Sequence, residues 1–313
     1  MELAFLKPEQ VPVALAALQS VAHGNGRLTE PERTLLELVA EMHGTRADLA
    51  SLPEPDPVTL AAQVVDPHQP KRLVQMAVVM STVDGDVTPV QERTVRAIAE
   101  ALEVDEAALK VLHGLVNDSK LLTRVHMMRR LMGRFVGEAR EAEGLKGVRK
   151  FMGPLFFGGG EDHEVAWRYK QLGLLPEGTF GRAYWEFCTS RRFAFPGEPG
   201  GLPERMVFHD FGHILAGYDT TPGGEIQQGA FQGGFVREDG FAFLMFAIIQ
   251  FHLDIKVTPV SPGYAGLFDV PKVLRAAQRG AACKVDLSDH WNPFAVADAP
   301  LEQIRAEYGV SAL

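Results

Sequence analysis

The feature that most constrains the fold of this chain is an ungapped internal repeat in its N-terminal third. Residues 25–32, Asn-Gly-Arg-Leu-Thr-Glu-Pro-Glu, align with residues 84–91, Asp-Gly-Asp-Val-Thr-Pro-Val-Gln. In both copies a glycine turn precedes a threonine that is followed three residues later by Glu or Gln, which is the pattern of a capping box at the start of a helix. The two pairs are Thr29 with Glu32 and Thr88 with Gln91. Because apolar residues recur at helical spacing on both sides of each turn, each copy is predicted to be a helix, a turn and a second helix.

The rest of the chain has the same helical periodicity, and few stretches alternate with period two, so we expect an all-α fold. Its 313 residues suffice for about two domains. We predict a helical bundle at residues 1–115, a basic amphipathic connecting helix at 116–160 and a second all-helical domain at 161–313. The helices predicted in the second domain are Val165–Leu172, Gly181–Arg192, Pro203–Ala216, Gly240–Leu253, Pro271–Cys283 and Pro300–Tyr308.

Charge, cysteine content and apolar runs together exclude several classes of protein and predict the cellular location. The net charge is −9, whereas a generic nucleic-acid-binding protein is basic, so we expect no nucleic-acid partner. Cys188 and Cys283 are the only cysteines, which excludes a disulfide framework and a cysteine-based zinc site and favours a reducing compartment. The N-terminus lacks a signal-peptide pattern, and the longest apolar run, Phe241–Ile249, is too short to span a membrane. We therefore expect a cytoplasmic location, with peripheral contact at the inner face of the cell membrane as an extension, and we allow for a homodimer.

The connecting segment differs from the rest of this acidic chain. Between Lys120 and Lys150, nine Lys or Arg residues and three acids give a charge of +6. An apolar helical stripe accompanies them (Leu121, Leu122, Val125, Met128, Leu131, Met132 and Phe135). A basic amphipathic helix of this kind can lie on an anionic membrane surface. The alternative, which we favour slightly, is an interdomain helix with a solvated charged face.

The candidate functional site is the run His209-Asp210-Phe211-Gly212-His213, followed by Glu225. Histidines four residues apart lie on one face of a helix, where both can reach one metal ion. A turn-forming stretch, residues 218–224, separates His213 from Glu225, so an antiparallel second helix would bring Glu225 back beside the histidines. Spacing alone gives a metal site and an incidental pair of surface or core histidines equal weight.

Imidazole and carboxylate ligands suit zinc and also suit non-haem Fe(II). In metalloproteases of the His-Glu-x-x-His type, the glutamate after the first histidine acts as the base. Here Asp210, one methylene shorter, holds that place, so a peptidase is disfavoured. From the residues alone, Asp210 is a metal ligand, a base or a bystander.

The N-terminal half resembles the TerB-like helical domains named after tellurite resistance. The resemblance rests on the Asp-Gly-x-Val-Thr-Pro turn that begins at Asp84. Asp84 and Asp86 could help bind a cation or a partner, but a turn plus a helix cap is the favoured interpretation, because such turns are common. The first copy carries Asn25 and Arg27 at these positions, which argues against a paired metal site.

Residues 165–313 resemble the fourth Coq protein family of ubiquinone (coenzyme Q) biosynthesis. That family is marked by His-Asp-x-x-His, with a Glu twelve residues after the second His in a Pro-Thr-x-x-x-Gly-Glu context. His209, Asp210, His213 and Glu225 match all four positions. The flanks are also similar: residues 175–184 match the family's Leu-Pro-x-x-Thr-Phe-Gly-x-Ala-Tyr segment, and residues 300–309 match its ending.

The resemblance implies an all-α protein that binds a divalent metal through His209, Asp210, His213 and Glu225, with zinc the first choice and iron or magnesium as alternatives. It implies a polyprenylated quinone precursor or an isoprenoid lipid as partner, and other quinone-biosynthesis proteins as further partners. The implied reaction is oxidative decarboxylation at C1 of a polyprenylated 4-hydroxybenzoate-derived ring, with Asp210 and Glu225 as the catalytic residues. Asp210 would be a fourth ligand or a base.

Two alternatives stay open. One is a non-catalytic, isoprenoid-binding scaffold for a quinone-biosynthesis complex, and the other is a metal-dependent hydrolase. The chain also departs from the family after Glu225, because Gly229-Ala230-Phe231-Gln232 stands where the family usually carries Lys-Trp-Phe-Glu. This departure bears on whether the substrate is identical.

Overall fold

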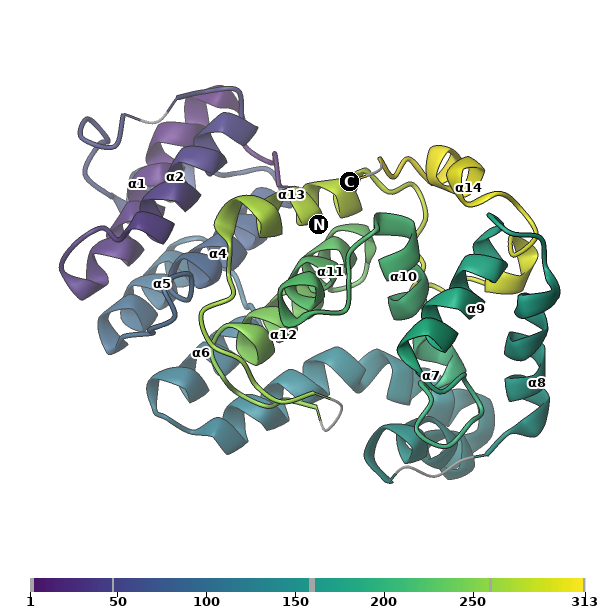
Figure 1. Cartoon of the computed structure of the whole chain (residues 1–313). Helices are drawn as coiled ribbons and strands as arrows, with labels where there is room; N and C mark the ends of the chain where they lie inside the picture. Colours follow the sequence, from purple (N-terminus) through teal and green to yellow (C-terminus); the bar gives the residue numbers. More distant parts are fainter. Residues whose placement is uncertain (1–2, 47, 158–160, 259–260, 312) are drawn as a thin grey trace.

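The computed structural model describes residues 3–46, 48–157, 161–258, 261–311 and 313 (Figure 1). Within these ranges the chain is helical, with two isolated β-bridges and no strand, so the predicted all-α fold is confirmed. The α-helices are α1 Val11–Ala22, α2 Glu30–Met42, α3 Pro57–Gln63, α4 Gln69–Met80, α5 Pro89–Ala101, α6 Ala108–Val116, α7 Lys120–Phe157, α8 His163–Gln171, α9 Phe180–Arg191, α10 Phe208–Ala216, α11 Pro222–Phe235, α12 Phe241–Phe251, α13 Val270–Ala282 and α14 Leu301–Tyr308. None of the helices in the described ranges is long and apolar enough to cross a membrane.

The internal repeat forms two helix pairs, α1 with α2 and α4 with α5, and both predicted capping boxes are present. The Thr29 hydroxyl accepts from the backbone N–H of Glu32, whose carboxylate accepts in return from the backbone N–H of Thr29 at 2.7 Å. Thr88 and Gln91 repeat this exchange, with distances of 3.2 and 2.9 Å. The same local device therefore starts the second helix of each pair.

The Asp84 turn matches the turn-and-cap interpretation. The Asp84 carboxylate accepts from the backbone N–H of Asp86 at 3.3 Å, and Gly85 has a φ of +86°, a conformation that favours glycine. Behind the turn, the buried ring of His252 at the end of α12 hydrogen-bonds the carbonyl oxygen of Thr82 at 3.1 Å. The turn thus lies against the second half of the chain. Cation or partner binding by Asp84 and Asp86, and the TerB-like resemblance, stay predictions.

Helix α7 occupies most of the predicted connecting segment, whose last three residues, 158–160, lie outside the described part. Its helical geometry is interrupted at Glu143 and Gly144, where φ is −135° and +62°. One face of its first half packs into the core through buried Met127, Leu131 and Phe135. Buried side chains of both predicted domains belong to one continuous core, and the domain boundaries themselves stay predictions.

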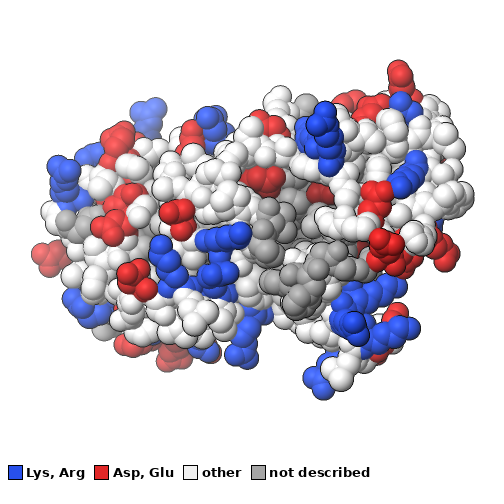
Figure 2. All heavy atoms as spheres, turned by 60° about the horizontal axis from the view of Figure 1, so that its bottom comes forward, with Lys and Arg blue, Asp and Glu red and all other residues white. Residues whose placement is uncertain are grey.

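The start of α7 is exposed. The predicted apolar stripe changes along the helix: Leu121, Leu122 and Val125 are 70%, 49% and 43% exposed, whereas its later members are buried or, at Met128, partly buried. No acidic residue occurs between residues 119 and 137. Figure 2 turns the side of the molecule along which α7 runs toward the viewer, and Lys and Arg side chains gather below its centre and at its lower right. The membrane-surface interpretation therefore fits the exposed start of the segment, and the interdomain-helix interpretation fits its buried part.

A buried ion cluster joins α7 to both halves. The Arg130 guanidinium contacts the Glu106 carboxylate at 2.7 Å and the Asp239 carboxylate, in the turn before α12, at 2.6 and 2.7 Å. The Arg130 and Glu106 side chains are 6% and 1% exposed, so these two charges are largely removed from water, whereas the Asp239 side chain is 36% exposed. Removing one partner from such a cluster costs about 3–5 kcal/mol, because the remaining charge stays buried.

Helix α11 lies at the centre of the second half, packed against α10, α12 and α13 (Figure 1). Glycines allow the closest of these contacts. A Cβ at Gly280 of α13 would lie 2.0 Å from the carbonyl oxygen of Phe231, and one at Gly234 of α11 would lie 2.4 Å from that of Ala277. The glycine-rich sequence of α11 is therefore needed for helix packing, and this packing fixes the position of the helix that carries Glu225.

Candidate metal centre

Helix α10 presents the two histidines. His209 and His213 lie one turn apart, with ring centroids 4.8 Å apart and ring planes at 85°. The side chain of His213 is fully buried and that of His209 is 29% exposed. The helix is shorter than predicted, because residues 204–206 form a 3-10 turn ahead of it, but both histidines lie within it.

The turn after α10 explains how Glu225 returns. The Asp219 carboxylate accepts from both the backbone N–H and the hydroxyl of Thr221, and the Thr221 hydroxyl caps α11 by accepting from the N–H of Gly224. A Cβ at Gly224 would lie 2.1 Å from the Asp219 carboxylate, so only glycine fits there. Glu225 then occupies the first turn of α11, where the positive end of the helix dipole favours a carboxylate.

His209, His213 and Glu225 converge, as the spacing predicted. The two Nε2 atoms are 3.3 Å apart, and each lies 3.4 Å from a carboxylate oxygen of Glu225. Two ligand atoms that are each about 2.0–2.1 Å from one tetrahedral zinc ion lie roughly 3.3–3.4 Å apart. The two Nε2 atoms have that spacing, and Glu225 presents one carboxylate oxygen to each of them, so that one ligand atom from each of the three residues lies within 4.8 Å of the other two. Within the described residues this is the one group of three or more His, Cys, Asp or Glu side chains so arranged.

Both histidines have hydrogen-bond partners that favour the neutral tautomer required for ligation. The Nδ1 atom of His213 lies 3.1 Å from the carbonyl oxygen of Tyr218, and that of His209 lies 3.2 Å from the amide oxygen of Gln232. Because these oxygens can only accept, each Nδ1 carries the proton. A neutral imidazole protonated at Nδ1 has its free lone pair on Nε2, which is the atom that faces Glu225. Partners of this kind commonly orient metal-ligating histidines.

Without an ion, His209 and Glu225 stabilise each other's charged forms. Burial disfavours the imidazolium of His209, but the hydrogen bond and charge of Glu225, together with the charge of Asp210, raise its pKa to about 9. Burial also raises the pKa of Glu225, yet its bonds to both histidines outweigh that effect and hold the pKa well below the usual range. The site therefore stabilises positive charge at the point between the three groups, which is also what a cation needs.

Asp210 is the one predicted ligand that the structure does not bring into this group. It lies on α10 beside the histidines, and its charge acts on α9: burial, and then this charge, raise the pKa of the Tyr184 hydroxyl and raise that of the Cys188 thiol to about 12. Burial likewise raises the pKa of Asp210 itself, against the charges of the histidines. Its predicted role as ligand or base stays a prediction.

Aromatic side chains wall the buried side of the centre. The Phe187 ring stacks on the His213 imidazole with centroids 5.7 Å apart, and the rings of Tyr184 and Phe211 stack at 4.3 Å. Phe193, which is 44% exposed, contacts Phe187 at a centroid distance of 5.8 Å. Apolar surface thus leads from the outside of α9 to one of the two histidines.

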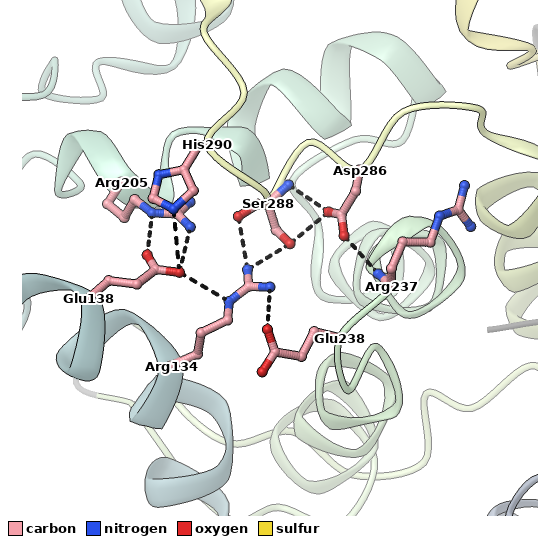
Figure 3. A network of polar contacts seen from close by, with 8 residues as sticks. All are labelled: Arg134, Glu138, Arg205, Arg237, Glu238, Asp286, Ser288 and His290. Atoms are coloured by element: carbon pink, nitrogen blue, oxygen red, sulfur yellow. Dashed lines mark hydrogen bonds and ion pairs between the residues drawn. The ribbon is translucent and has the colours of Figure 1, made fainter.

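An ion-pair network holds the segment that leads into α10 (Figure 3). Arg205, four residues before His209, forms a two-point pair with Glu138 of α7 at 2.7 and 3.1 Å. Arg134 of α7 lies 3.6 Å from the same carboxylate and donates to the carbonyl and hydroxyl oxygens of Ser288 at 2.8 Å. The exposed His290 lies 3.9 Å from Glu138. The network joins α7, the start of α10 and the loop before α14.

Several residues that position the site were not found from sequence. Gln232 was detectable, because it lies seven residues after Glu225 and therefore on the same face of α11. Arg279 of α13 and Arg305 of α14 hydrogen-bond the last carbonyl groups of α10, and no local pattern indicates such distant contacts.

Comparisons with known proteins add distant similarity to solved structures. No protein-family model matches this sequence, and a search of curated proteins gives no match. Among solved structures, the chain is similar to a protein from Nostoc punctiforme PCC 73102 that is provisionally assigned to ubiquinone biosynthesis. The identity is 18% and the TM-score is 0.34, and the match covers 66% of this chain and 98% of the other.

Proposed function

We propose that this chain is a metal-dependent protein of ubiquinone or related prenyl-quinone biosynthesis. The observation that carries the metal site is the convergence of His209 Nε2, His213 Nε2 and the Glu225 carboxylate at 3.3–3.4 Å, with both Nδ1 atoms engaged elsewhere. Zinc suits this donor set best, and iron or magnesium are the alternatives. The pathway rests on the motif and flanking segments shared with the Coq family in residues 165–313.

The proposed reaction replaces the C1 carboxyl of a polyprenylated 4-hydroxybenzoate-derived ring with a hydroxyl. The change breaks the bond from C1 to the carboxyl carbon, releases carbon dioxide, forms a C1–O bond with oxygen from water and removes two electrons. Dioxygen, reduced to hydrogen peroxide, or another two-electron oxidant is therefore a required co-reactant. A divalent cation, when bound, supplies a site for the substrate carboxylate and stabilises developing negative charge. Asp210, close to the cluster but outside it, is suited to accept the proton of the ring hydroxyl, because its raised pKa lies nearer to that of a working base.

The test is turnover of a prenylated 4-hydroxybenzoate carrying a ¹³C label in its carboxyl group, with dioxygen present. We expect labelled carbon dioxide from the zinc- or iron-loaded wild type, and little from Glu225→Gln or Asp210→Asn. His163→Ala is the matched control, because that imidazole is 91% exposed and lies on α8, away from the cluster. Full turnover by Glu225→Gln would contradict the catalytic proposal.

The second candidate is a non-catalytic, isoprenoid-binding scaffold. The observation that favours it is the exposed apolar and basic face of α7, which offers a contact for a membrane or for another quinone-biosynthesis protein. In that case the metal is structural, and native mass spectrometry finds bound isoprenoid lipid without turnover. Peripheral attachment to the inner face of the cell membrane suits both candidates.

A further inference from the structure

We propose that Gln232 is the positioning residue that sets the tautomer and orientation of His209, and through them the metal affinity of the centre. This inference rests on the proposed metal site, and it concerns a side chain outside the ligand set. Gln232 is 3% exposed and lies two turns after Glu225 on the same face of α11. Its amide oxygen lies 3.2 Å from Nδ1 of His209.

A second glutamine holds the same residue by its backbone. Gln228, one turn before Gln232 on α11, is fully buried and donates from its amide to the carbonyl oxygen of His209 at 3.2 Å. The contact needs Gly212, because a Cβ there would lie 2.2 Å from the Gln228 amide nitrogen. With its backbone held by Gln228 and its ring by Gln232, His209 is fixed at two points by α11.

The two histidines differ in what holds them. Tyr218 holds His213 through a backbone carbonyl, which a side-chain substitution does not remove. His209 depends on a side chain, and its ring is the more exposed of the two. Without the Gln232 oxygen, the proton of neutral His209 can move to Nε2, and the ring can turn away from Glu225. Gln232 is therefore a side chain outside the ligand set whose substitution acts directly on the ring of His209.

The acceptor is also uncharged, because it is the oxygen of a carboxamide. A carboxylate hydrogen-bonded to Nδ1 makes the imidazole a stronger donor to the metal. The amide of Gln232 fixes the tautomer without that added negative charge. The structure thus assigns to this chain a centre whose metal is held less tightly than the same three ligands would hold it beside a carboxylate.

The test measures the Zn²⁺ affinity of the full chain by competition with a chelating indicator, in the wild type, Gln232→Leu and Gln232→Glu. We expect Gln232→Leu to weaken Zn²⁺ binding by about tenfold to a hundredfold, the usual cost of losing such a partner. Gln232→Glu, which keeps the acceptor and adds charge, should bind more tightly than the wild type. Gln227→Leu is the control, because Gln227 bonds the Gly223 carbonyl oxygen instead. Unchanged affinity in Gln232→Leu would overturn the inference.

A second measurement separates this inference from the metal site itself. In the metal-free protein, the ¹⁵N chemical shifts of the neutral His209 ring report which of its two nitrogens carries the proton. We expect the Nδ1–H form in the wild type and a mixture of both tautomers in Gln232→Leu. If the wild type binds no metal but the tautomer changes, the proposed function fails and the positioning role stands. If metal binds but the tautomer is unchanged, the positioning role fails alone.

Discussion

The Arg279 guanidinium donates to the carbonyl oxygen of Ala216 at 2.9 Å, so a helix from the C-terminal part of the chain closes the end of the helix that carries both histidines. The same guanidinium donates to the Tyr218 hydroxyl at 2.6 Å. Tyr218 is the residue whose carbonyl group orients His213. One arginine therefore satisfies the end of α10 and steadies the backbone that holds a ligand.

Arg279→Leu should lower the free energy of unfolding by about 1–3 kcal/mol, because a helix-end carbonyl group and a buried hydroxyl lose their charged partner. It should also weaken zinc binding, through Tyr218. Urea denaturation and zinc titration measure both effects. Arg275→Leu is the control, because Arg275 is an exposed residue on the same helix. Equal stability of the two variants would show that Arg279 does not hold α10.

Two Gly→Ala substitutions, one at the contact between α11 and α13 and one on α7, should change the stability of the protein in opposite directions. Gly280→Ala should destabilise the protein by about 1–3 kcal/mol, because the new methyl group overlaps the carbonyl oxygen of Phe231. Gly133→Ala, on an exposed face of α7 with no atom near the new methyl group, should stabilise by about 0.5–1 kcal/mol. Thermal unfolding of both variants tests the packing, and a Gly280→Ala protein as stable as the wild type would contradict it.

The shifted pKa values of His209 and Glu225 make the stability of the metal-free protein depend on pH. The His209 pKa is raised from an unfolded value of about 6.5 to about 9, so the stability it contributes is complete below about pH 6.5 and is lost as the pH rises through 9. The Glu225 pKa is lowered, so its contribution is present above about pH 4.5 and is lost in acid.

In the proposed metal-bound form, the ion would take the place of the Nε2 proton of His209. The rise in Tm on adding Zn²⁺ should therefore grow as the pH increases from about 6.5 to about 9. Calorimetric scans of chelator-treated and zinc-loaded protein across this range measure the difference. A Tm increase that is independent of pH would mean that the ion does not compete with that proton.

The exposed face of α7 predicts binding to anionic vesicles. The wild type should sediment with vesicles of phosphatidylcholine and phosphatidylglycerol but not with phosphatidylcholine alone. Leu121→Glu combined with Leu122→Glu should weaken this binding by at least about tenfold, because each buried leucine contributes roughly 1.5–3 kcal/mol. Val58→Glu is the control, since Val58 is 76% exposed on α3. If the double variant binds as the wild type does, the face serves another purpose.

Local patterns predicted most of the helices and the three converging side chains. Thr29 and Thr88 start helices through contacts three residues away, which a sequence shows directly. His209, His213 and Glu225 meet because one turn joins two adjacent helices. The break at Gly144 was missed, because the helical pattern on both sides of it is continuous.

Contacts between segments that are distant in the chain could not be predicted from the sequence. The exposure of Leu121 and the burial of Leu131 on one amphipathic helix depend on which neighbours α7 packs against. The position of Asp210 outside the group follows from helical geometry, because a residue next to His209 in the sequence does not share the face on which His209 and His213 lie.

Metal analysis of the purified chain tests the central claim most directly. After dialysis against Zn²⁺ and removal of free ions, the wild type should retain one ion per chain, because the described residues form one such group. His163→Ala should retain the same amount. His213→Ala, with circular dichroism to confirm that it is folded, should retain none. A folded His213→Ala protein that keeps a full complement of metal, or a wild type that binds none, would contradict the account.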